Sequence, residues 1–312
     1  MAQVVNQHSP LPDLIGQRLS NPRFVVGLEQ LAQRYFRQTI VLRTRSSHLA
    51  RDEKCKFTIK DVSKLRGAWG NALLRGASEN ARQNLACNWQ PECGLFALFQ
   101  SHGELEKGRM FHKPYDIGFG HAPHNDVQLR VTLHGFACDW VDEAAASLVN
   151  GLRHGLGNQP VPWHVLDRGI ETHEQVAPLP DANRYLIELQ TPLALRQGGS
   201  LDQDVRSLLV SFAQRARNLA RWQDSELIFP DRFLDELHAA RISRIQGDKT
   251  GWRRKSYRQD GNVIPVEGVT GIIEVANITP AIRKLLSFAP VLQIGARASI
   301  GFGRIHIVAV KD

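Results

Sequence analysis

The C-terminal stretch of the chain, residues 293–306, places glycines and arginines just before a closing hydrophobic segment. Glycine permits positive φ and a close approach of the backbone to a ligand, and arginine matches the charge of a phosphate. The candidate phosphate contacts here are Gly295, Gly301, Gly303, Arg297 and Arg304. A dinucleotide-binding fingerprint would need a helix after its glycines, whereas the residues after Gly303 are typical of a strand. The stretch predicts a phosphate-binding loop, with a glycine-bearing turn that only packs as the alternative.

A second stretch, residues 241–258, is strongly basic and contains Asp248 as its only acid. Its lysines and arginines suit backbone phosphates, and its aromatic side chains offer surfaces on which unpaired bases can stack. The candidate RNA contacts are Lys249, Trp252, Arg253, Arg254, Lys255, Tyr257 and Arg258. The alternative is a solvated charged hairpin, but a run of one sign repels itself unless an anionic partner is present. We therefore expect RNA at this stretch.

Composition is compatible with this expectation. The chain of 312 residues is long enough for two domains, and its 42% hydrophobic and 22% charged residues are ordinary for a globular protein. The formal net charge of +8 favours a polyanionic partner. No apolar run reaches membrane-spanning length and no signal-peptide pattern is present, so we expect a cytoplasmic protein without a membrane partner.

The four cysteines are too few and too scattered for a disulfide framework, so we expect reduced thiols. Cys87 and Cys93 stand further apart than the cysteines of a structural zinc pair, and no second close pair accompanies them. We therefore predict neither a bound metal nor a cofactor.

The elements that would position the two stretches follow one plan in the second half of the chain. After a polar segment with two prolines, residues 172–183, the pattern predicts a strand near 185–195, a helix near 201–222, strands near 234–245 and 263–276, a helix near 280–288 and a strand near 304–310. This βαββαβ order is the ferredoxin-like plan. The basic stretch would lie at the tip of the hairpin that joins the middle strands.

The first half follows the same plan less regularly. Its spacing predicts a short helix near 25–35, a strand at 38–43, a helix at 64–75, a strand at 127–133, a helix near 141–152 and a strand near 162–166. We expect a long insertion near 76–125. The prediction is an α+β protein of two tandem ferredoxin-like (RRM-like) domains, residues 1–175 with the insertion and residues 182–312.

Several runs resemble the CRISPR-associated endoribonucleases of the RAMP superfamily that process precursor crRNA. In the second half the runs are 252–259, 268–273 and 294–304. In the first half they are 65–73, 94–96, 133–135 and 151–157, which match the family in type and order. The resemblance covers most of residues 37–310.

This resemblance implies two ferredoxin-like domains that bind a repeat hairpin and cut it without a metal. In the implied reaction, the ribose 2′-OH attacks the phosphate and leaves a 2′,3′-cyclic phosphate and a 5′-OH, which needs a base, an acid and nearby positive charge. The catalytic candidates are His48, between the first strand and the first helix, and Arg66 and Arg75 on that helix. The alternatives are an exposed loop histidine and arginines that tie or cap the helix. Further candidates, more simply insertion or core-edge histidines, are His112, His121, His124 and His134.

We therefore expect a metal-independent endoribonuclease that cleaves precursor crRNA at the repeat hairpin and stays bound to the mature crRNA in a CRISPR effector complex. The expected partners are the repeat hairpin and other effector subunits, namely backbone and crRNA-capping RAMP proteins. The rival is a RAMP subunit that binds crRNA in such a complex without cutting it. The basic stretch and the glycine stretch fit both, and the match to the processing family over both halves favours the enzyme.

Overall fold

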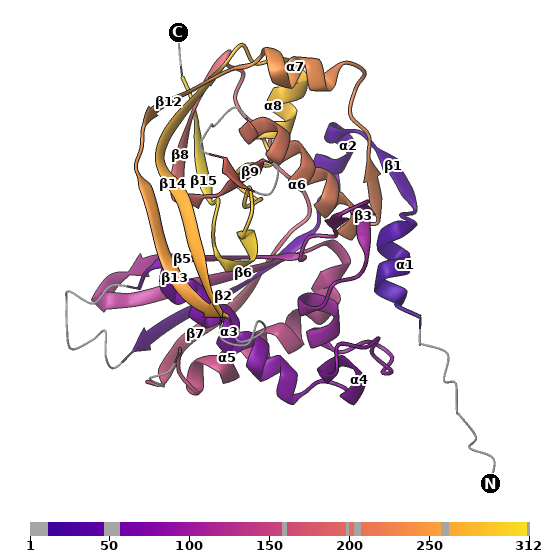
Figure 1. Cartoon of the computed structure of the whole chain (residues 1–312), viewed down its shortest axis with the longest axis vertical. Helices are drawn as coiled ribbons and strands as arrows, with labels where there is room; N and C mark the ends of the chain where they lie inside the picture. Colours follow the sequence, from indigo (N-terminus) through magenta and orange to yellow (C-terminus); the bar gives the residue numbers. More distant parts are fainter. Residues whose placement is uncertain are drawn as a thin grey trace.

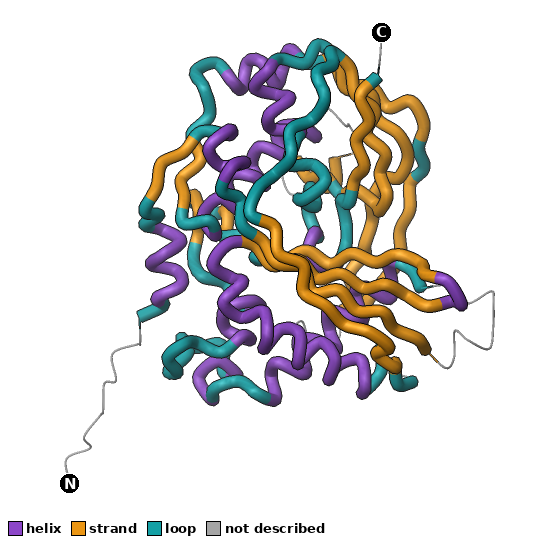
Figure 2. The backbone as a smooth tube through the Cα atoms, turned by 180° about the vertical axis from the view of Figure 1, so that it is seen from behind, coloured by secondary structure: helices purple, strands orange, loops and turns teal. Residues whose placement is uncertain are grey.

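A computed structural model describes residues 12–46, 57–157, 161–197, 200–202, 207–256 and 262–310. Two antiparallel sheets of four and five strands dominate it, one built from each half of the chain. Figure 1 shows the first sheet lying across the lower part of the molecule and the second standing above it, and Figure 2 shows both from behind.

The first sheet has the strand order β5-β6-β2-β7. Its strands are β2 (Arg37–Ser46), β5 (Tyr115–Ala122), β6 (Asp126–His134) and β7 (Trp163–His173). Alternate residues of β2, such as Ile40 and Leu42, are buried because they face α3 (Ile59–Arg75) and α5 (Val141–Arg153), which lie below the sheet in Figure 1. Among the described residues, no α-helix covers the opposite face of the sheet (Figure 2).

The second sheet has the order β12-β14-β8-β15, and β13 pairs with the remaining length of β14. Its strands are β8 (Arg184–Leu193), β12 (Arg241–Gln246), β13 (Lys249–Ser256), β14 (Asn262–Ala276) and β15 (Ile305–Ala309). The helices α6 (Leu208–Trp222) and α8 (Pro280–Leu286) cover one face. Helix α8 begins as the sequence predicts, because Thr279 accepts a hydrogen bond from the Ile282 N–H at 3.3 Å and Pro280 occupies the first turn.

Shorter elements complete the described part of the chain. They are α1 (Leu14–Ser20), β1 (Phe24–Val26), α2 (Leu28–Gln33), α4 (Glu79–Arg82), η1 (Leu95–Phe99), β3 (Glu104–Glu106), β4 (Arg109–Met110), η2 (Pro123–Asn125), η3 (Gly135–Trp140), β9 (Leu195–Gln197), β10 (Ser200–Asp202), β11 (Ser225–Leu227), α7 (Phe233–Ala239) and η6 (Ala298–Ile300). Strand β1 pairs in parallel with β11, so the N-terminal segment packs against the second half of the chain.

The α+β class and the two ferredoxin-like units are confirmed, since each sheet shows the antiparallel order that a βαββαβ chain produces. Several element predictions are wrong. The basic stretch does not lie at a hairpin tip, because residues 241–246 form β12 and residues 249–256 form β13, and both strands pair with β14. Strands β13 and β14 are called the basic hairpin below. Residues 115–122 form β5 of the first sheet although they fall within the expected insertion, because Gly118 and Gly120 give this strand the composition of a loop. Residues 233–239 form α7 rather than the start of a strand, with Phe233 and Leu237 buried one helical turn apart.

Candidate RNA-binding and cleavage site

The glycine-rich loop, residues 293–304, belongs to the second half of the chain. It extends from the second sheet and contacts β5 of the first sheet and helix α3 (Figure 1). The loop packs tightly at Gly301, where a Cβ atom would lie 2.9 Å from side-chain atoms of both Ile59 and Val62 and 3.2 Å from the Ile117 carbonyl oxygen. Residues Ile59 and Val62 belong to the first turn of α3. The loop therefore joins the second unit to the start of the helix on which the sequence places two catalytic candidates.

A small hydrophobic cluster fixes the basic hairpin to this loop. The loop cluster consists of buried Ala194, Val266, Ile300 and Phe302, with Ile59, Trp252 and Ala296 packed around it. The ring centroids of Trp252 and Phe302 are 5.5 Å apart. Trp252 is consequently half-buried, and its packing role stands beside the base-stacking role predicted from the sequence. The cluster brings the basic hairpin, the glycine-rich loop and the first turn of α3 to one place.

Two glycines of the loop have protein partners for their backbone donors. The Gly303 N–H donates to the Pro192 carbonyl at 2.9 Å, and the Gly301 N–H donates to the Ala298 carbonyl at 2.9 Å. Gly295, Gly301 and Gly303 all have positive φ, at 80°, 88° and 74°. These contacts give the glycines a packing role, which is the alternative that the sequence left open. Their role in phosphate binding stays a prediction.

Replacing Gly303 by alanine is expected to lower the free energy of unfolding by about 3 kcal/mol. Its φ of 74° is unfavourable for any side chain, and an added Cβ would overlap the carbonyl oxygen of Ile294. Urea unfolding followed by tryptophan fluorescence measures the effect. Gly67→Ala is the matched control, because Gly67 lies in α3 with open space at its Cβ and should gain about 0.5–1 kcal/mol. Equal midpoints for the two variants would contradict the expectation.

The two loop arginines donate to backbone carbonyls in different sheets. Arg297 donates from Nη2 to the Pro265 carbonyl at 2.7 Å. Arg304 is half-buried and donates from Nη1 to the Phe119 carbonyl of β5 at 3.1 Å, which ties the second sheet to the first. Burial and the neighbouring charge of Arg130 lower the pKa of Arg304. No carboxylate of the described residues forms an ion pair with Arg304, so a phosphate at this position would meet a positive charge that no described acid neutralises.

Arg130 was not recognised from the sequence. It lies on β6 and faces the side of the first sheet that carries no helix, between the buried residues Leu129 and Val131. Its guanidinium is ion-paired with Glu171 of β7. The signal that could have identified it is the alternation along β6, which places a basic side chain on the polar face of a sheet of the RRM-like type.

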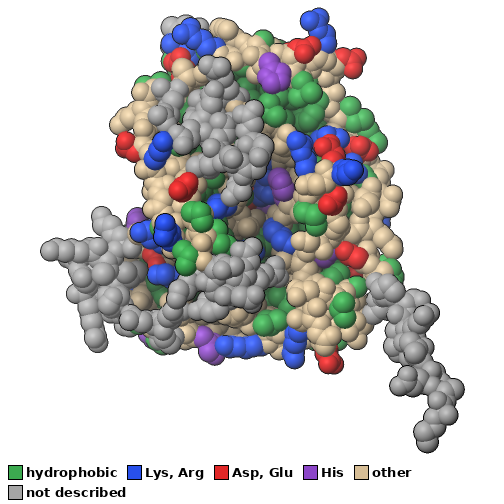
Figure 3. Space-filling model, in the orientation of Figure 1, with side chains coloured by type: hydrophobic (Ala, Val, Ile, Leu, Met, Phe, Trp, Pro, Cys, Tyr) green, Lys and Arg blue, Asp and Glu red, His purple; other side chains and the backbone are tan. Residues whose placement is uncertain are grey.

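The basic hairpin presents part of its predicted charge. Lys249 and Arg253 are exposed on β13. Arg254 and Lys255 lie on the same strand, where the backbone alone is described, and Tyr257 and Arg258 lie outside the described residues. In Figure 3, blue side chains surround the hollow at the centre of this face, between the upper and lower halves of the molecule.

The structure does not bring Arg66 and Arg75, two of the predicted catalytic residues, together at one site. His48 lies outside the described residues. Arg66 is half-buried, donates from Nε to the Tyr115 hydroxyl at 2.9 Å and lies 5.0 Å from the Phe99 ring centroid. Arg75 is exposed at the end of α3, with Nη1 3.0 Å from Nε2 of His154. Arg66 and Arg75 are nine residues apart in α3, which separates them by roughly 13 Å along the helix axis. They therefore do not line one common site. Their catalytic role stays a prediction.

Lys60 is an additional basic group near the loop cluster. It is exposed in the first turn of α3, next to Ile59 of the cluster. In the same turn Asp61 caps the helix by accepting the Thr58 N–H at 3.0 Å, and it also binds Lys64 Nζ at 2.8 Å. The first turn of α3 therefore offers a lysine that no described carboxylate pairs with, beside a helix end that already has its own carboxylate.

Behind the loop, a buried polar network joins the two halves of the chain. Asp116 of β5 accepts Arg215 Nη2 of α6 at 2.7 Å and lies 2.9 Å from Nε2 of His134, whose Nδ1 lies 3.2 Å from the Tyr35 hydroxyl. Burial alone would raise the pKa of Asp116, but Arg215 and His134 together hold it below its ordinary value. Burial lowers the pKa of His134. We infer that this network is structural, because its members are almost fully shielded from water.

The other candidate histidines divide by burial. His121 and His124 are exposed at the far end of β5 and in the following turn. His112 is packed against α6, where its backbone N–H donates to Asn218 Oδ1 at 2.6 Å. Burial, and secondarily the charge of Arg215, lower the pKa of His112 to about 3. A histidine with that pKa is neutral near pH 7 and cannot supply a proton there.

The stability of the protein is expected to fall as the pH drops from about 6.5 towards 3. His112 is neutral in the folded protein down to about pH 3, whereas in the unfolded chain it takes up a proton near pH 6.5. The unfolded state therefore binds more protons than the folded state in this window, so lowering the pH decreases the free energy of unfolding. Urea midpoints measured across the window should decline less steeply for His112→Asn. His121→Asn, at an exposed position, should retain the wild-type slope, and identical slopes for all three proteins would contradict the assignment.

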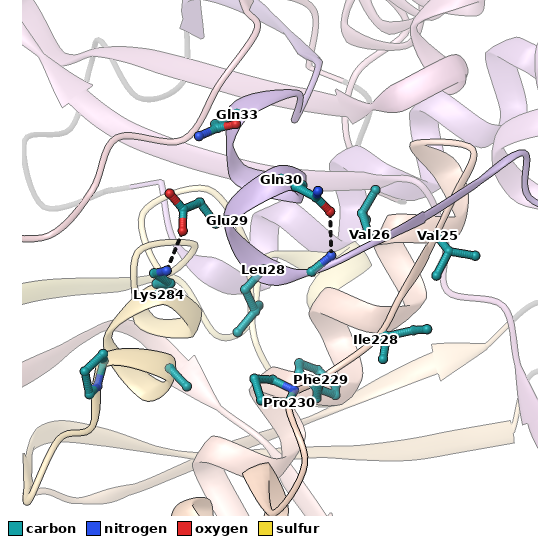
Figure 4. Close-up of a pocket in the computed structure, with 13 residues that line it drawn as sticks. Val25, Val26, Leu28, Glu29, Gln30, Gln33, Ile228, Phe229, Pro230 and Lys284 are labelled. Carbon is teal, nitrogen blue, oxygen red and sulfur yellow. Dashed lines mark hydrogen bonds and ion pairs between the residues drawn. The ribbon is translucent and has the colours of Figure 1, made fainter.

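A separate groove of about 820 Å³ lies at the junction of α2, α8 and the segment after β11 (Figure 4). Its walls are mainly apolar, with Val25, Ile228 and Phe229 among them. The ion pair between Lys284 Nζ and Glu29 Oε2, 2.5 Å long, crosses one side. The groove lacks the excess of positive charge that RNA requires, so we place the candidate site at the loop cluster.

Two further observations concern metals and membranes. Within the described ranges, no cluster of three or more histidine, cysteine, aspartate or glutamate side chains is arranged to hold a metal ion. No helix in the same part of the chain has the length and apolar character needed to cross a bilayer.

The fold and the site define a class of protein, the tandem ferredoxin-like α+β proteins in which a C-terminal glycine-rich loop meets the first helix of the N-terminal unit. Residues 187–305 match the family model described as CRISPR-associated endoribonuclease Cas6. This match covers the glycine-rich loop and most of the second sheet, but it ends at the first residue of β15. Over these residues it confirms the resemblance to the CRISPR-associated endoribonucleases that the sequence predicts.

Solved structures share the whole fold. The product complex of Cas6 (TTHA0078) is 16% identical, with 88% of this chain and 100% of that chain covered and a TM-score of 0.52. The product complex of Cas6 (TTHB231), a protein of Thermus thermophilus, is 13% identical, with 88% and 99% covered and a TM-score of 0.53. At these identities the likeness concerns the fold alone. No curated protein sequence matches the chain.

Proposed function

We propose that the protein is a metal-independent endoribonuclease that cleaves precursor crRNA at the repeat hairpin. The observation that carries this proposal is the junction at the loop cluster, where the family-matched glycine-rich loop rests on the first turn of α3. Exposed Lys60 and Arg253 are on the elements that meet there. Similar folds have been solved as a product complex and as a substrate mimic complex of Cas6.

The chemistry assigned to the site is attack of a ribose 2′-OH on the adjacent phosphate, with a 2′,3′-cyclic phosphate and a 5′-OH as products. The reaction needs a group that takes the 2′-OH proton and one that protonates the leaving 5′-oxygen, and His48 can serve because its ordinary pKa lies near neutrality. Positive charge must stabilise the phosphorane, and Lys60 and Arg253 are the described candidates. Arg66 is already committed to Tyr115, so we assign it to support of the α3–β5 contact.

The first test is incubation of the purified protein with its cognate repeat RNA in EDTA, followed by sizing of the products and analysis of their ends. A single cut that leaves a 2′,3′-cyclic phosphate supports the proposed enzyme. Tight hairpin binding without cleavage would instead support the rival, a RAMP subunit that binds crRNA without cutting it. Absence of binding would contradict both.

Retention of the product in a CRISPR effector complex is the second part of the proposal. Arg304 supports it, because it lies where β5 meets the second sheet, has no described acid as its partner and extends positive charge beyond the loop cluster. An RNA strand that follows both surfaces would contact two separate basic regions and dissociate slowly. Backbone and crRNA-capping RAMP subunits are the proposed protein partners. Co-purification of mature crRNA and these subunits with the tagged protein would test the association.

Replacing Lys249 and Arg253 together by alanine is expected to weaken RNA binding and its salt dependence. Each side chain that contacts a phosphate contributes roughly one unit to the slope of log K against log salt, so the double variant should lose up to about two units. Titrations of repeat RNA at several salt concentrations measure the slope. Lys107→Ala is the control, because Lys107 is exposed in the β3–β4 turn away from β13. An unchanged slope in the double variant would remove the basic hairpin from the RNA interface.

A further inference from the structure

Two cysteines in the segment between α4 and η1 form a close pair. The Sγ atoms of Cys87 and Cys93 are 3.7 Å apart, and both residues are buried, with 7% and 3% of their surface exposed. The sulfurs are in contact but unbonded, since a disulfide would bring them to about 2.0 Å. Of the five residues between them, 88–91 are exposed and Glu92 is half-buried.

The surroundings of the two sulfurs differ. Sγ of Cys87 lies 3.2 Å from the Ser78 hydroxyl and accepts the Cys93 N–H at 3.4 Å. Although burial opposes ionisation, these hydrogen bonds bring the pKa of Cys87 below its ordinary value. Burial raises the pKa of Cys93. The Cys87 sulfur is therefore the one that acts as the thiolate nucleophile, and the Cys93 sulfur is in contact with it.

We propose that Cys87 and Cys93 are a redox modification site that closes into a disulfide on exposure to a low-molecular-weight disulfide such as oxidised glutathione. The Cys87 thiolate attacks one glutathione sulfur, forms a mixed disulfide and releases glutathione thiolate. Cys93 then loses its proton and attacks the Cys87 sulfur, which releases the second glutathione. The protein dithiol is oxidised and one glutathione disulfide is reduced to two thiols. In a reducing compartment the pair rests as two thiols, in keeping with transient redox-sensing cysteines.

Cys138 provides an internal reference on the same chain. It is 6% exposed, donates from Sγ to the Leu133 carbonyl at 3.3 Å and has a pKa raised to about 12 by burial. Its burial is close to that of the pair, but it lacks a neighbouring cysteine and its pKa is shifted in the opposite direction from that of Cys87. Selective reaction of Cys87 would consequently reflect the paired geometry rather than exposure alone.

The test is incubation of the full-length native protein with oxidised glutathione, blocking of the remaining thiols and peptide mapping by mass spectrometry. We expect a Cys87–Cys93 cross-link in the wild type, reversed by dithiothreitol, and modification of Cys87 at least about tenfold faster than that of Cys138. Cys93→Ser should accumulate a glutathione adduct on Cys87 because the resolving thiol is absent. Cys138→Ser is the matched control and should form the cross-link as the wild type does.

Three results would overturn the proposal. The first is a stable glutathione adduct on Cys87 of the wild type without ring closure. The second is equal reaction of Cys87 and Cys138, which would show that the pair has no special reactivity. The third is stoichiometric zinc on the purified protein that keeps both thiols unreactive. Because the wild-type map alone decides each case, misfolding of a variant does not affect the outcome, and the inference is independent of the proposed RNA cleavage.

Discussion

Asp116→Asn is expected to lower the free energy of unfolding by about 3–5 kcal/mol. The carboxylate of Asp116 is buried and lies 2.7 Å from Nη2 of Arg215, which is itself 4% exposed. Asparagine has the size of aspartate and keeps an acceptor oxygen, but it carries no negative charge. The guanidinium charge of Arg215 would then be buried without a counter-charge, which is strongly destabilising. Urea unfolding at pH 7 measures the difference, and the loss should be large because this pair connects β5 to α6.

The matched control is Glu171→Gln, which removes an ion pair of the same type from the surface. Glu171 pairs with Arg130, and its side chain is 44% exposed, so the expected loss is about 0–1 kcal/mol. Adding Arg215→Met to Asp116→Asn should recover part of the stability, because the uncompensated charge is then removed as well. If Asp116→Asn and Glu171→Gln cost the same, the buried network does not hold the two halves together as proposed.

His48→Ala is expected to slow cleavage of repeat RNA by about 10²–10⁴-fold while the affinity for the RNA changes little. His48 lies outside the described residues, in the chain between β2 and α3. Helix α3, which follows His48 in the chain, begins at the place where the glycine-rich loop and the basic hairpin converge. Single-turnover cleavage in EDTA gives the rate, and filter binding gives the affinity.

His238→Ala is the control for this experiment, because His238 is an exposed histidine on α7. It should cleave at the wild-type rate. A wild-type rate in His48→Ala would remove His48 from the mechanism and direct attention to Lys60 and the basic hairpin. A parallel loss of affinity and rate would instead assign His48 to RNA binding.

The fold could be predicted from the sequence because its strongest periodic segments are the strands and helices of the two sheets. Helix α6 illustrates this: its buried residues recur at helical spacing, and the structure places a helix there. Strand β5 could not be recognised, since glycines interrupt the alternation that marks a strand. Its place in the sheet depends on pairing with β6, which is information from another part of the chain.

The candidate site was only partly accessible to sequence reasoning. Glycine and arginine identify the loop, but the sequence cannot show that Gly301 rests on Ile59 or that Trp252 packs on Phe302, because these contacts join segments far apart in the chain. Arg66 and Arg75 share a helix and were therefore grouped, although Arg66 lies in the middle of that helix and Arg75 at its C-terminal end. Arg130 was missed because its significance depends on the neighbouring Arg304.

The parallel pairing of β1 with β11 has a consequence for the order in which the protein can mature on the ribosome. Phe24 pairs with Ser225, and the Phe24 N–H donates to the Asp224 carbonyl at 3.1 Å. Translation delivers β1 early, but its partner emerges only after the whole first sheet has been synthesised. The N-terminal segment therefore remains without its pairing strand until β11 has been synthesised, after every strand of the first sheet and before most strands of the second.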